Sequence, residues 1–189
     1  MKKLLKIIVL TFATLGIMLL VAFLICNIKP MDMKAKTEEL KAYCARNGYN
    51  TDYAILVDYG RTSLQRRIFV YDFRQDKIVM RSLAGHGAGG CSTVLRADFS
   101  NAHGSHCSSL GHYKVGRNRM MYNRPRVPAF ELIGLDKTNS NAHERGILIH
   151  PSAGPLSWGC VTLPVHRYHQ LSEFLKSQPK NVIMWVYEK

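Results

Sequence analysis

The sequence predicts a mainly β domain with one or two flanking helices, preceded by an N-terminal membrane-anchor helix. Short apolar runs rich in β-prone residues recur between residues 53 and 187 and are separated by turn residues, which is typical of strands. A segment near the C-terminus instead repeats its apolar residues with helical spacing. Residues 7–25 carry no charge and are mostly apolar, at about the length that a helix needs to cross a bilayer.

The N-terminal segment opens with the positively charged run Met1-Lys2-Lys3-Leu4-Leu5-Lys6. The apolar stretch after it is long for a secretory signal, and no cleavage site of small residues follows. We therefore expect residues 1–29 to form an uncleaved signal anchor in the membrane, with the rest of the chain outside the cytoplasm. Cleavage with secretion, and lipidation at Cys26, stay open, although the bulky Ile25 is unusual before a lipidated cysteine.

Residues 30–49 are expected to form a helical spacer ahead of the main domain, which either packs on the domain or separates it from the membrane. The stretch from Met31 to Asn47 is rich in residues of high helix propensity, and Gly48 is a plausible stop. The main domain then spans residues 50–189 and contains the β-prone runs.

The first three predicted strands form an antiparallel meander. They span residues 53–59, 66–73 and 77–84. A long loop follows at residues 85–109, and loops of this length inside a compact domain are usually functional. The remaining strands are predicted at residues 110–116, 130–135, 146–149 and 182–187. A helix is predicted over residues 165–176, because Tyr168, Leu171 and Phe174 fall on one of its faces.

The composition limits the classes of partner. The chain carries 26 Lys and Arg against 13 Asp and Glu, a formal net charge of +13, which favours anionic partners. The basic residues are scattered, however, and neither a zinc-finger spacing nor a basic helix occurs, so we expect no nucleic-acid binding. We expect the protein to be a monomer.

The most informative feature is a histidine followed ten residues later by a cysteine, His150 and Cys160. A thiol is a useful nucleophile only as thiolate, and a nearby imidazole is the usual way to form one. Prolines and glycines between them force a turn, so a strand that turns and comes back can place Cys160 beside His150. The competing interpretation is plain packing, because a cysteine next to a tryptophan is often simply buried.

The other cysteines allow two alternatives in the long loop. Cys91 and Cys107 could form a disulfide in an oxidising compartment, which would leave Cys160 free. With His103 and His106 they could instead hold zinc, but their spacing fits no standard zinc finger. We therefore expect no metal and no cofactor.

The segment from His150 to Ser157-Trp158-Gly159-Cys160 resembles the signature of YkuD-type L,D-transpeptidases, in which a histidine precedes Ser-x-Gly-Cys by about this distance. Further short motifs resemble one less-studied branch of that family and extend the resemblance to residues 50–187. They lie at residues 57–59, 67–72, 85–87 and 99–113. The resemblance implies a mixed or antiparallel, sandwich-like β fold and acyl transfer on peptidoglycan stem peptides in the bacterial cell envelope.

The resemblance also implies roles for the residues of this segment. Cys160 would attack the carbonyl before the terminal D-amino acid of a donor peptide and form a thioester. An amine of a neighbouring stem would then take the acyl group. His150 would hold and return the proton, Gly159 and Cys160 would offer backbone N–H groups to the oxyanion, and Ser157 would orient the turn.

The chain departs from the commoner family pattern at three positions. Pro151 follows the histidine where glycine is frequent, Trp158 stands where many members have a second histidine, and Thr162 stands where many have arginine. The two latter changes put the recognition of a substrate carboxylate, and thus the donor, in doubt. The residues expected to bind substrate or to shape its site are Trp158, Thr162, Ser109, Gly111, Tyr113 and His86.

Two alternatives to the transferase stay open. The same Cys–His pair could serve an L,D-carboxypeptidase or amidase, in which water takes the acyl group. A non-catalytic wall-binding module could also have kept the fold, in which case Cys160→Ala would change no property of the protein.

Overall fold

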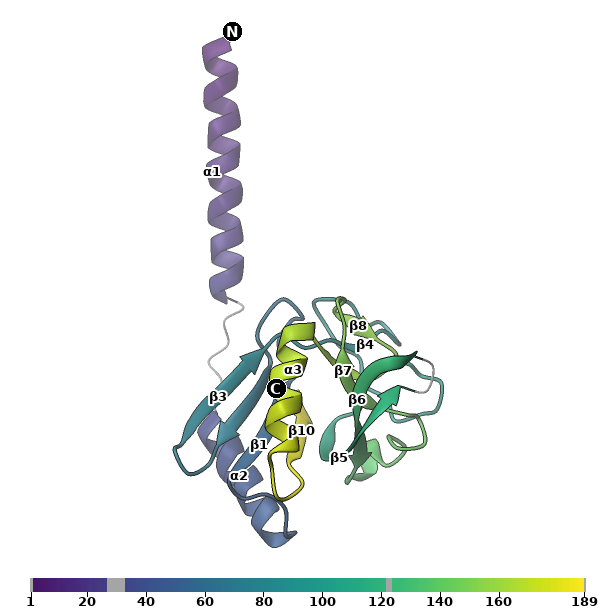
Figure 1. Cartoon of the computed structure of the whole chain (residues 1–189). Coiled ribbons are helices and arrows are strands. Elements are labelled where there is room, and N and C mark those ends of the chain that lie inside the picture. The colour runs from purple at the N-terminus through teal and green to yellow at the C-terminus, as the bar shows by residue number, and fades with distance from the viewer. Residues whose placement is uncertain (1, 27–32, 122–123, 189) are drawn as a thin grey trace. The chain divides into compact units, whose positions relative to one another are not determined.

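The structure is a computed structural model that describes residues 2–26, 33–121 and 124–188 (Figure 1). The chain divides into two compact units, Met1–Asp32 and Met33–Lys189. The first contains the helix α1 (Lys2–Cys26). No helix within the described residues has both the length and the apolar character needed to cross a membrane. The predicted boundary at residues 29 and 30 lies outside the described residues.

The second unit is built on one mixed sheet of eight strands in the order β3-β2-β1-β10-β5-β6-β7-β9. The strands are β1 (Tyr53–Asp58), β2 (Ile68–Asp72), β3 (Lys77–Ser82), β5 (Gly111–Met121), β6 (Arg124–Gly134), β7 (Leu148–Pro151), β9 (Val161–Leu163) and β10 (Ile183–Tyr187). Neighbouring strands are antiparallel except for the parallel pairs β1–β10 and β7–β9. A second, two-stranded sheet joins β4 (His86–Gly87) to β8 (Leu156–Ser157). The 3₁₀ helix η1 (Lys137–Asn139) follows β6.

Two helices cover opposite faces of the sheet around β1. Ile55 and Val57 belong to one core cluster, together with Leu171 of α3 (Val165–Lys176). Ala54 and Leu56 belong to another, which includes residues of α2 (Met33–Arg46). Because successive strand residues point to opposite faces, β1 is buried on both sides. This explains why residues 53–59 read as a continuous apolar run rather than as an alternating one.

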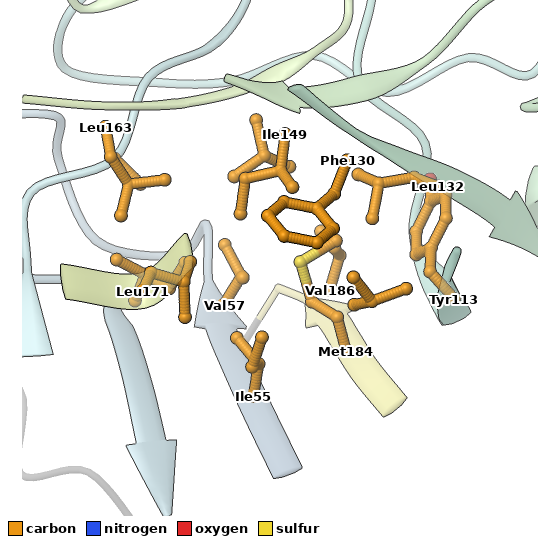
Figure 2. Packing of buried hydrophobic residues seen from close by; sticks show 14 of the residues in the cluster. Ile55, Val57, Tyr113, Phe130, Leu132, Ile149, Leu163, Leu171, Met184 and Val186 are labelled. Carbon is orange, nitrogen blue, oxygen red and sulfur yellow. The ribbon is translucent and has the colours of Figure 1, made fainter. Parts of the chain in front are cut away.

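The sheet curves around the larger of these cores. Figure 2 shows Ile55 and Val57 of β1 near Ile149 of β7 and Phe130 of β6, although three strands separate β1 from β7 in the sheet. The predicted sandwich-like arrangement is therefore achieved by one bent sheet of eight strands rather than by two stacked large sheets. The curvature brings the far edge, β7 and β9, next to the loops that follow β1 and β3.

Helix α2 belongs to the compact unit. Leu40 and Cys44 are completely buried against β1, β2 and β10, and burial raises the pKa of the Cys44 thiol to about 12. The helix ends before Gly48, whose φ of +71° is the left-handed conformation typical of a helix stop. Residues 33–46 thus pack on the sheet, which is one of the two arrangements expected for this segment.

Several sequence predictions agree with the structure. The meander β1–β2–β3 and the helix at residues 165–176 are confirmed. After His150 the chain turns and comes back beside β7, and the returning strand β9 runs parallel to β7. The reason is the turn around Gly154 and Pro155, after which β8 pairs with β4 before the chain reaches β9.

Candidate active site

Cys160 follows a tight turn whose geometry requires glycine. Gly159 has a φ of +107°, and a Cβ added there would lie 2.8 Å from the carbonyl oxygen of Cys107. The Ser157 hydroxyl donates a hydrogen bond to the Cys160 carbonyl (2.7 Å), and the Ser108 hydroxyl donates to the Gly159 carbonyl (3.3 Å). Loop residues on both sides therefore fix the backbone that carries the thiol.

The Cys160 sulfur is half-buried beside the start of β7. The backbone N–H of Leu148 donates to Sγ (3.4 Å), and the thiol points toward the Gly146 carbonyl at 3.9 Å. Burial raises the pKa of Cys160, while the Leu148 N–H and the charge of Arg145 lower it. The thiol is thus protonated at neutral pH, so that a nearby base is needed to make it a nucleophile.

His150 lies on the strand next to this cysteine. In the parallel register of β7 and β9, Ile149 is level with Val161 and both point into the core, so His150 faces the opposite side. Cys160 directly precedes Val161, and the hydrogen bond from the Leu148 N–H to its sulfur places it beside Leu148. His150 and Leu148 share one face of β7, since they are two residues apart.

The hydrogen bond of the His150 ring identifies its basic nitrogen. Nδ1 lies 2.9 Å from the Pro151 carbonyl oxygen, and a carbonyl can only accept. Nδ1 therefore carries the proton in the neutral ring and Nε2 is the basic nitrogen. Since the acceptor is a backbone carbonyl, proline at position 151 preserves this bond. His150 as a whole is 7% exposed and thus buried.

Thr162 is not on an open surface. It is 1% exposed, and its Oγ1 is buried without a hydrogen-bond partner. The Gly85 N–H donates to the Thr162 carbonyl (2.8 Å), and a Cβ at Gly85 would collide with Oγ1. The Tyr59 hydroxyl donates to the Gly85 carbonyl (2.7 Å), which fixes the segment that covers Thr162. Thr162 thus serves the packing between β9 and this segment.

Ser109, Gly111 and Tyr113 support the start of β5. The Tyr113 hydroxyl donates to the Ser109 carbonyl (2.8 Å), and the Ser109 hydroxyl donates to the Ser100 carbonyl (2.9 Å). Gly111 has a φ of +123°, and a Cβ there would lie 2.7 Å from Oδ2 of Asp136. Ser109 and Tyr113 are buried, so the structure places all three behind the surface that carries the thiol.

Trp158 is 74% exposed and therefore does not belong to the core. Its indole ring contacts the ring of His106 at a centroid distance of 5.1 Å. Trp158 stands on the turn that leads to Gly159 and Cys160, and His106 contacts it from the long loop at residues 85–109.

His86 is completely buried in a polar cluster. The Arg67 guanidinium donates to its Nδ1 (2.7 Å), so that Nε2 carries the proton and faces the Arg96 carbonyl at 3.3 Å. Burial, reinforced by the charge of Arg67, lowers the pKa of His86 to about 4. The imidazole is neutral at pH 7 and lies beneath the surface that a peptide could reach.

This depressed pKa predicts a loss of stability on acidification. The unfolded state, with a histidine pKa near 6.5, binds the proton at higher pH than the folded state, with a pKa of about 4. The stabilisation that comes from keeping His86 neutral is therefore fully present above about pH 6.5. As the pH falls toward 4, the free energy of unfolding declines by roughly 3 kcal/mol from this cause. Urea unfolding at several pH values should show a steeper acid-side decline for the natural chain than for His86→Gln. His166→Gln, at an exposed helix position, should keep the natural slope.

Sequence reasoning missed three residues that shape the site. Ser108 holds the Gly159 carbonyl, Arg67 organises the cluster around His86, and Arg145 lies beside the thiol. The two arginines looked like the other scattered basic residues, for which a solvated surface is the usual expectation. The available signal for Arg67 was its place directly before the apolar run 68–71.

The cysteines and possible metal ligands complete the description of the site. Cys44, Cys91, Cys107 and Cys160 all carry free thiols, so the structure does not contain the Cys91–Cys107 disulfide. In the part of the chain that the structure describes, no group of three or more His, Cys, Asp or Glu side chains is arranged to hold a metal ion.

Comparisons with known proteins identify the family and the fold of the chain. The family model of the L,D-transpeptidase catalytic domain matches residues 27–187. No curated protein sequence matches the chain. Among solved structures, Bd1075 of Bdellovibrio bacteriovorus is similar with a TM-score of 0.50 and 19% identity, over 75% of this chain and 49% of that one. This likeness shows a shared fold.

Two other solved structures are similar at lower scores. The L,D-transpeptidase of Xylanimonas cellulosilytica DSM 15894 has a TM-score of 0.43 and 13% identity, over 77% of this chain and 68% of that chain. The helical cell shape determining protein Pgp2 of Campylobacter jejuni has a TM-score of 0.49 and 19% identity, over 75% of this chain and 50% of that chain. This chain thus spans about half the length of the Bdellovibrio and Campylobacter chains.

Proposed function

Because the chain belongs to the L,D-transpeptidase catalytic-domain family, whose members modify peptidoglycan, we propose that it is a cell-envelope acyltransferase acting on stem peptides through a thioester on Cys160. The observation that carries this proposal is the parallel register of β7 and β9. In support of the proposal, the Cys160 sulfur accepts a hydrogen bond from the Leu148 N–H, and His150, with Nε2 as its basic nitrogen, follows two residues later on the same strand.

The first half-reaction transfers the acyl group to the enzyme. His150 takes the thiol proton at Nε2, and the Cys160 sulfur forms a bond to the donor carbonyl carbon. The carbonyl electrons move to oxygen, where the N–H groups of Gly159 and Cys160 in the turn stabilise the oxyanion. The oxyanion collapses, the C–N bond breaks, and the imidazolium returns its proton to the leaving amine of the terminal D-amino acid.

The second half-reaction releases the acyl group. An amine of another stem peptide attacks the thioester while His150 takes its proton. The C–S bond then breaks, and the thiolate regains the proton. If water attacks the thioester instead, the same steps release the shortened peptide, and the protein acts as an L,D-carboxypeptidase.

The predicted site residues divide into two groups. Trp158 is exposed beside the turn, and we assign it to the wall of the donor site. Ser157 fixes the turn through the Cys160 carbonyl. The buried residues shape the site from behind without contacting substrate. They are Thr162, Ser109, Gly111, Tyr113 and His86.

Mass spectrometry tests the proposal. The full chain, with its thiols shown to be reduced, is incubated with a synthetic stem tetrapeptide ending in D-alanine. We expect an acyl adduct on Cys160 and release of D-alanine, followed by cross-linked dimers if an amine acceptor is used. If the peptide is shortened to the tripeptide and no dimers form, the protein is an L,D-carboxypeptidase instead. Unmodified protein with unprocessed peptide would contradict both.

The place of action follows from the substrate. Peptidoglycan lies outside the cytoplasmic membrane, so we propose an envelope location for the domain. Anchoring through residues 1–29, and the monomeric state, remain predictions from the sequence. Sedimentation of the full chain with membranes and its mass in solution would test them.

A further inference from the structure

Arg145 lies beside the Cys160 turn and is locked in place. Its Nη1 donates to the Ser100 carbonyl (2.9 Å) and to the Ser109 hydroxyl (2.8 Å). Its Nη2 donates to the Cys107 carbonyl (2.6 Å) and, over a longer distance of 3.3 Å, to the Ser105 hydroxyl. A Cβ added at Gly159 would lie 3.2 Å from Nη2, so the guanidinium is in contact with the turn that carries the thiol.

The charge of this guanidinium is uncompensated. All four of its hydrogen-bond acceptors are neutral oxygens, and no carboxylate among the described residues lies within ion-pair distance of it. Other arginines of the domain do have such partners, such as Arg96 with Asp98 at 2.6 Å and Arg119 with Glu131 at 2.7 Å. A fixed and half-buried positive charge without a counter-ion, in contact with a nucleophile turn, is arranged to meet a negative charge from outside the chain.

We propose that Arg145 recognises the carboxylate of the donor peptide and so makes the site selective for stem peptides with a free C-terminus directly after the scissile bond. This inference rests on the proposed function, in which the leaving group is a terminal D-amino acid. The carboxylate of that residue is attached to the carbon next to the leaving nitrogen. When the Cys160 sulfur meets the donor carbonyl carbon, the carboxylate is therefore only a few bonds from the turn that Arg145 contacts.

The neighbouring groups indicate on which side of Arg145 the carboxylate binds. Ser100, Ser105 and Cys107, which accept its hydrogen bonds, also line a cavity of about 610 Å³. Arg96, Asp98 and Glu188 line the same cavity. The charges of Arg96 and Asp98 are paired with each other, so the negative charge of Glu188 remains to disfavour an anion there. The carboxylate thus approaches from the Cys160 side, where Nη2 of the guanidinium faces Gly159.

Two donors that differ only at the C-terminus separate this role from a structural one. The stem tetrapeptide ending in D-alanine and the same peptide ending in D-alanine amide share every bond that the enzyme breaks and forms. A charge-assisted contact predicts that kcat/KM for acylation favours the acid by about tenfold in the natural chain. Raising the salt concentration should narrow this preference, because it screens the charges.

Arg145→Gln should bring the ratio of kcat/KM for the acid donor to kcat/KM for the amide donor close to one. Arg145→Lys keeps the charge and should retain part of the preference for the acid. Any loss common to both donors reports the loosened loop or the altered thiol and cancels in the ratio. Arg96→Gln is the matched control, because the Arg96 charge is already paired with Asp98, and it should keep the natural ratio.

The outcomes separate the two proposals. If neither donor acylates Cys160 in the natural chain, the proposed function fails. If both do so with a ratio that neither salt nor Arg145→Gln changes, the function stands and the role of Arg145 is overturned. If Arg145→Gln does not fold, the salt dependence of the acid preference in the natural chain decides whether a charged contact recognises the carboxylate.

Discussion

Replacing Cys160 with alanine is expected to abolish acylation and transpeptidation, with a loss of at least about a thousandfold in rate. The reason is chemical, because no other group of the site can form the covalent bond to the donor carbonyl. Ser157 is committed to the Cys160 carbonyl and Ser108 to the Gly159 carbonyl. The rate of D-alanine release from the stem tetrapeptide measures the effect directly.

The matched control for this variant is Cys91→Ala. Cys91 is an exposed free thiol in the neighbouring loop, and its removal should leave the rate unchanged. Cys160→Ala itself should unfold at nearly the same urea concentration as the natural chain, since a half-buried thiol contributes little to packing. Undiminished turnover by a folded Cys160→Ala protein would show that another group carries the reaction, whereas unchanged binding with no turnover in either protein would favour a wall-binding module.

The parts of the fold that follow from local patterns were predictable. The three strands of the meander are joined by short turns, and the helix at residues 165–176 shows its apolar spacing within a few turns. The pairing of β1 with β10 was not predictable, because it joins segments about 130 residues apart and no local signal encodes it. The same is true of the parallel return of β9, which depends on β8 finding β4 elsewhere in the chain.

The candidate site divides in the same way. The His150 and Cys160 pair is visible because its residue types and turn-rich spacing are local. The burial of His86 was not visible, because it depends on Arg67 and on the Arg96 carbonyl, which the fold brings together from separate segments. The hydrogen-bond acceptors of Arg145 come from the long loop at residues 85–109. Nothing in the sequence around Arg145 distinguishes this residue from a solvated arginine.

Replacing Arg67 with methionine is expected to lower the free energy of unfolding by roughly 3 kcal/mol. Arg67 is completely buried, and its Nε donates to the Ala84 carbonyl (2.7 Å) and its Nη1 to the Arg61 carbonyl (3.0 Å). Its Nη2 donates to Ser63 and His86, and its guanidinium lies over the Tyr59 ring at 4.7 Å. Methionine fills much of the same volume but supplies no donor, so several buried acceptors are left unpaired.

The opposing effect is that burial of this charge is itself unfavourable, and it lowers the pKa of Arg67. Loss of the buried charge thus offsets part of the loss of hydrogen bonds. The loss of the hydrogen bonds is the larger effect here, because water cannot reach the acceptors that are left without a donor. Urea unfolding should show a lower midpoint with an unchanged slope. Arg66→Met, at the exposed neighbouring position, should change stability by less than about 0.5 kcal/mol. A natural-like midpoint for Arg67→Met would show that these bonds contribute nothing net.

The same variant also changes the response to acid. The charge of Arg67 is one cause of the low pKa of His86, so its removal should raise that pKa toward 6.5. The difference between the folded and unfolded states then shrinks, and with it the part of the acid-side decline that His86 causes. Arg67→Met should therefore be less stable than the natural chain at pH 7 but should lose less of its remaining stability between pH 6.5 and 4. Equal slopes for the two proteins would mean that Arg67 does not set the protonation of His86.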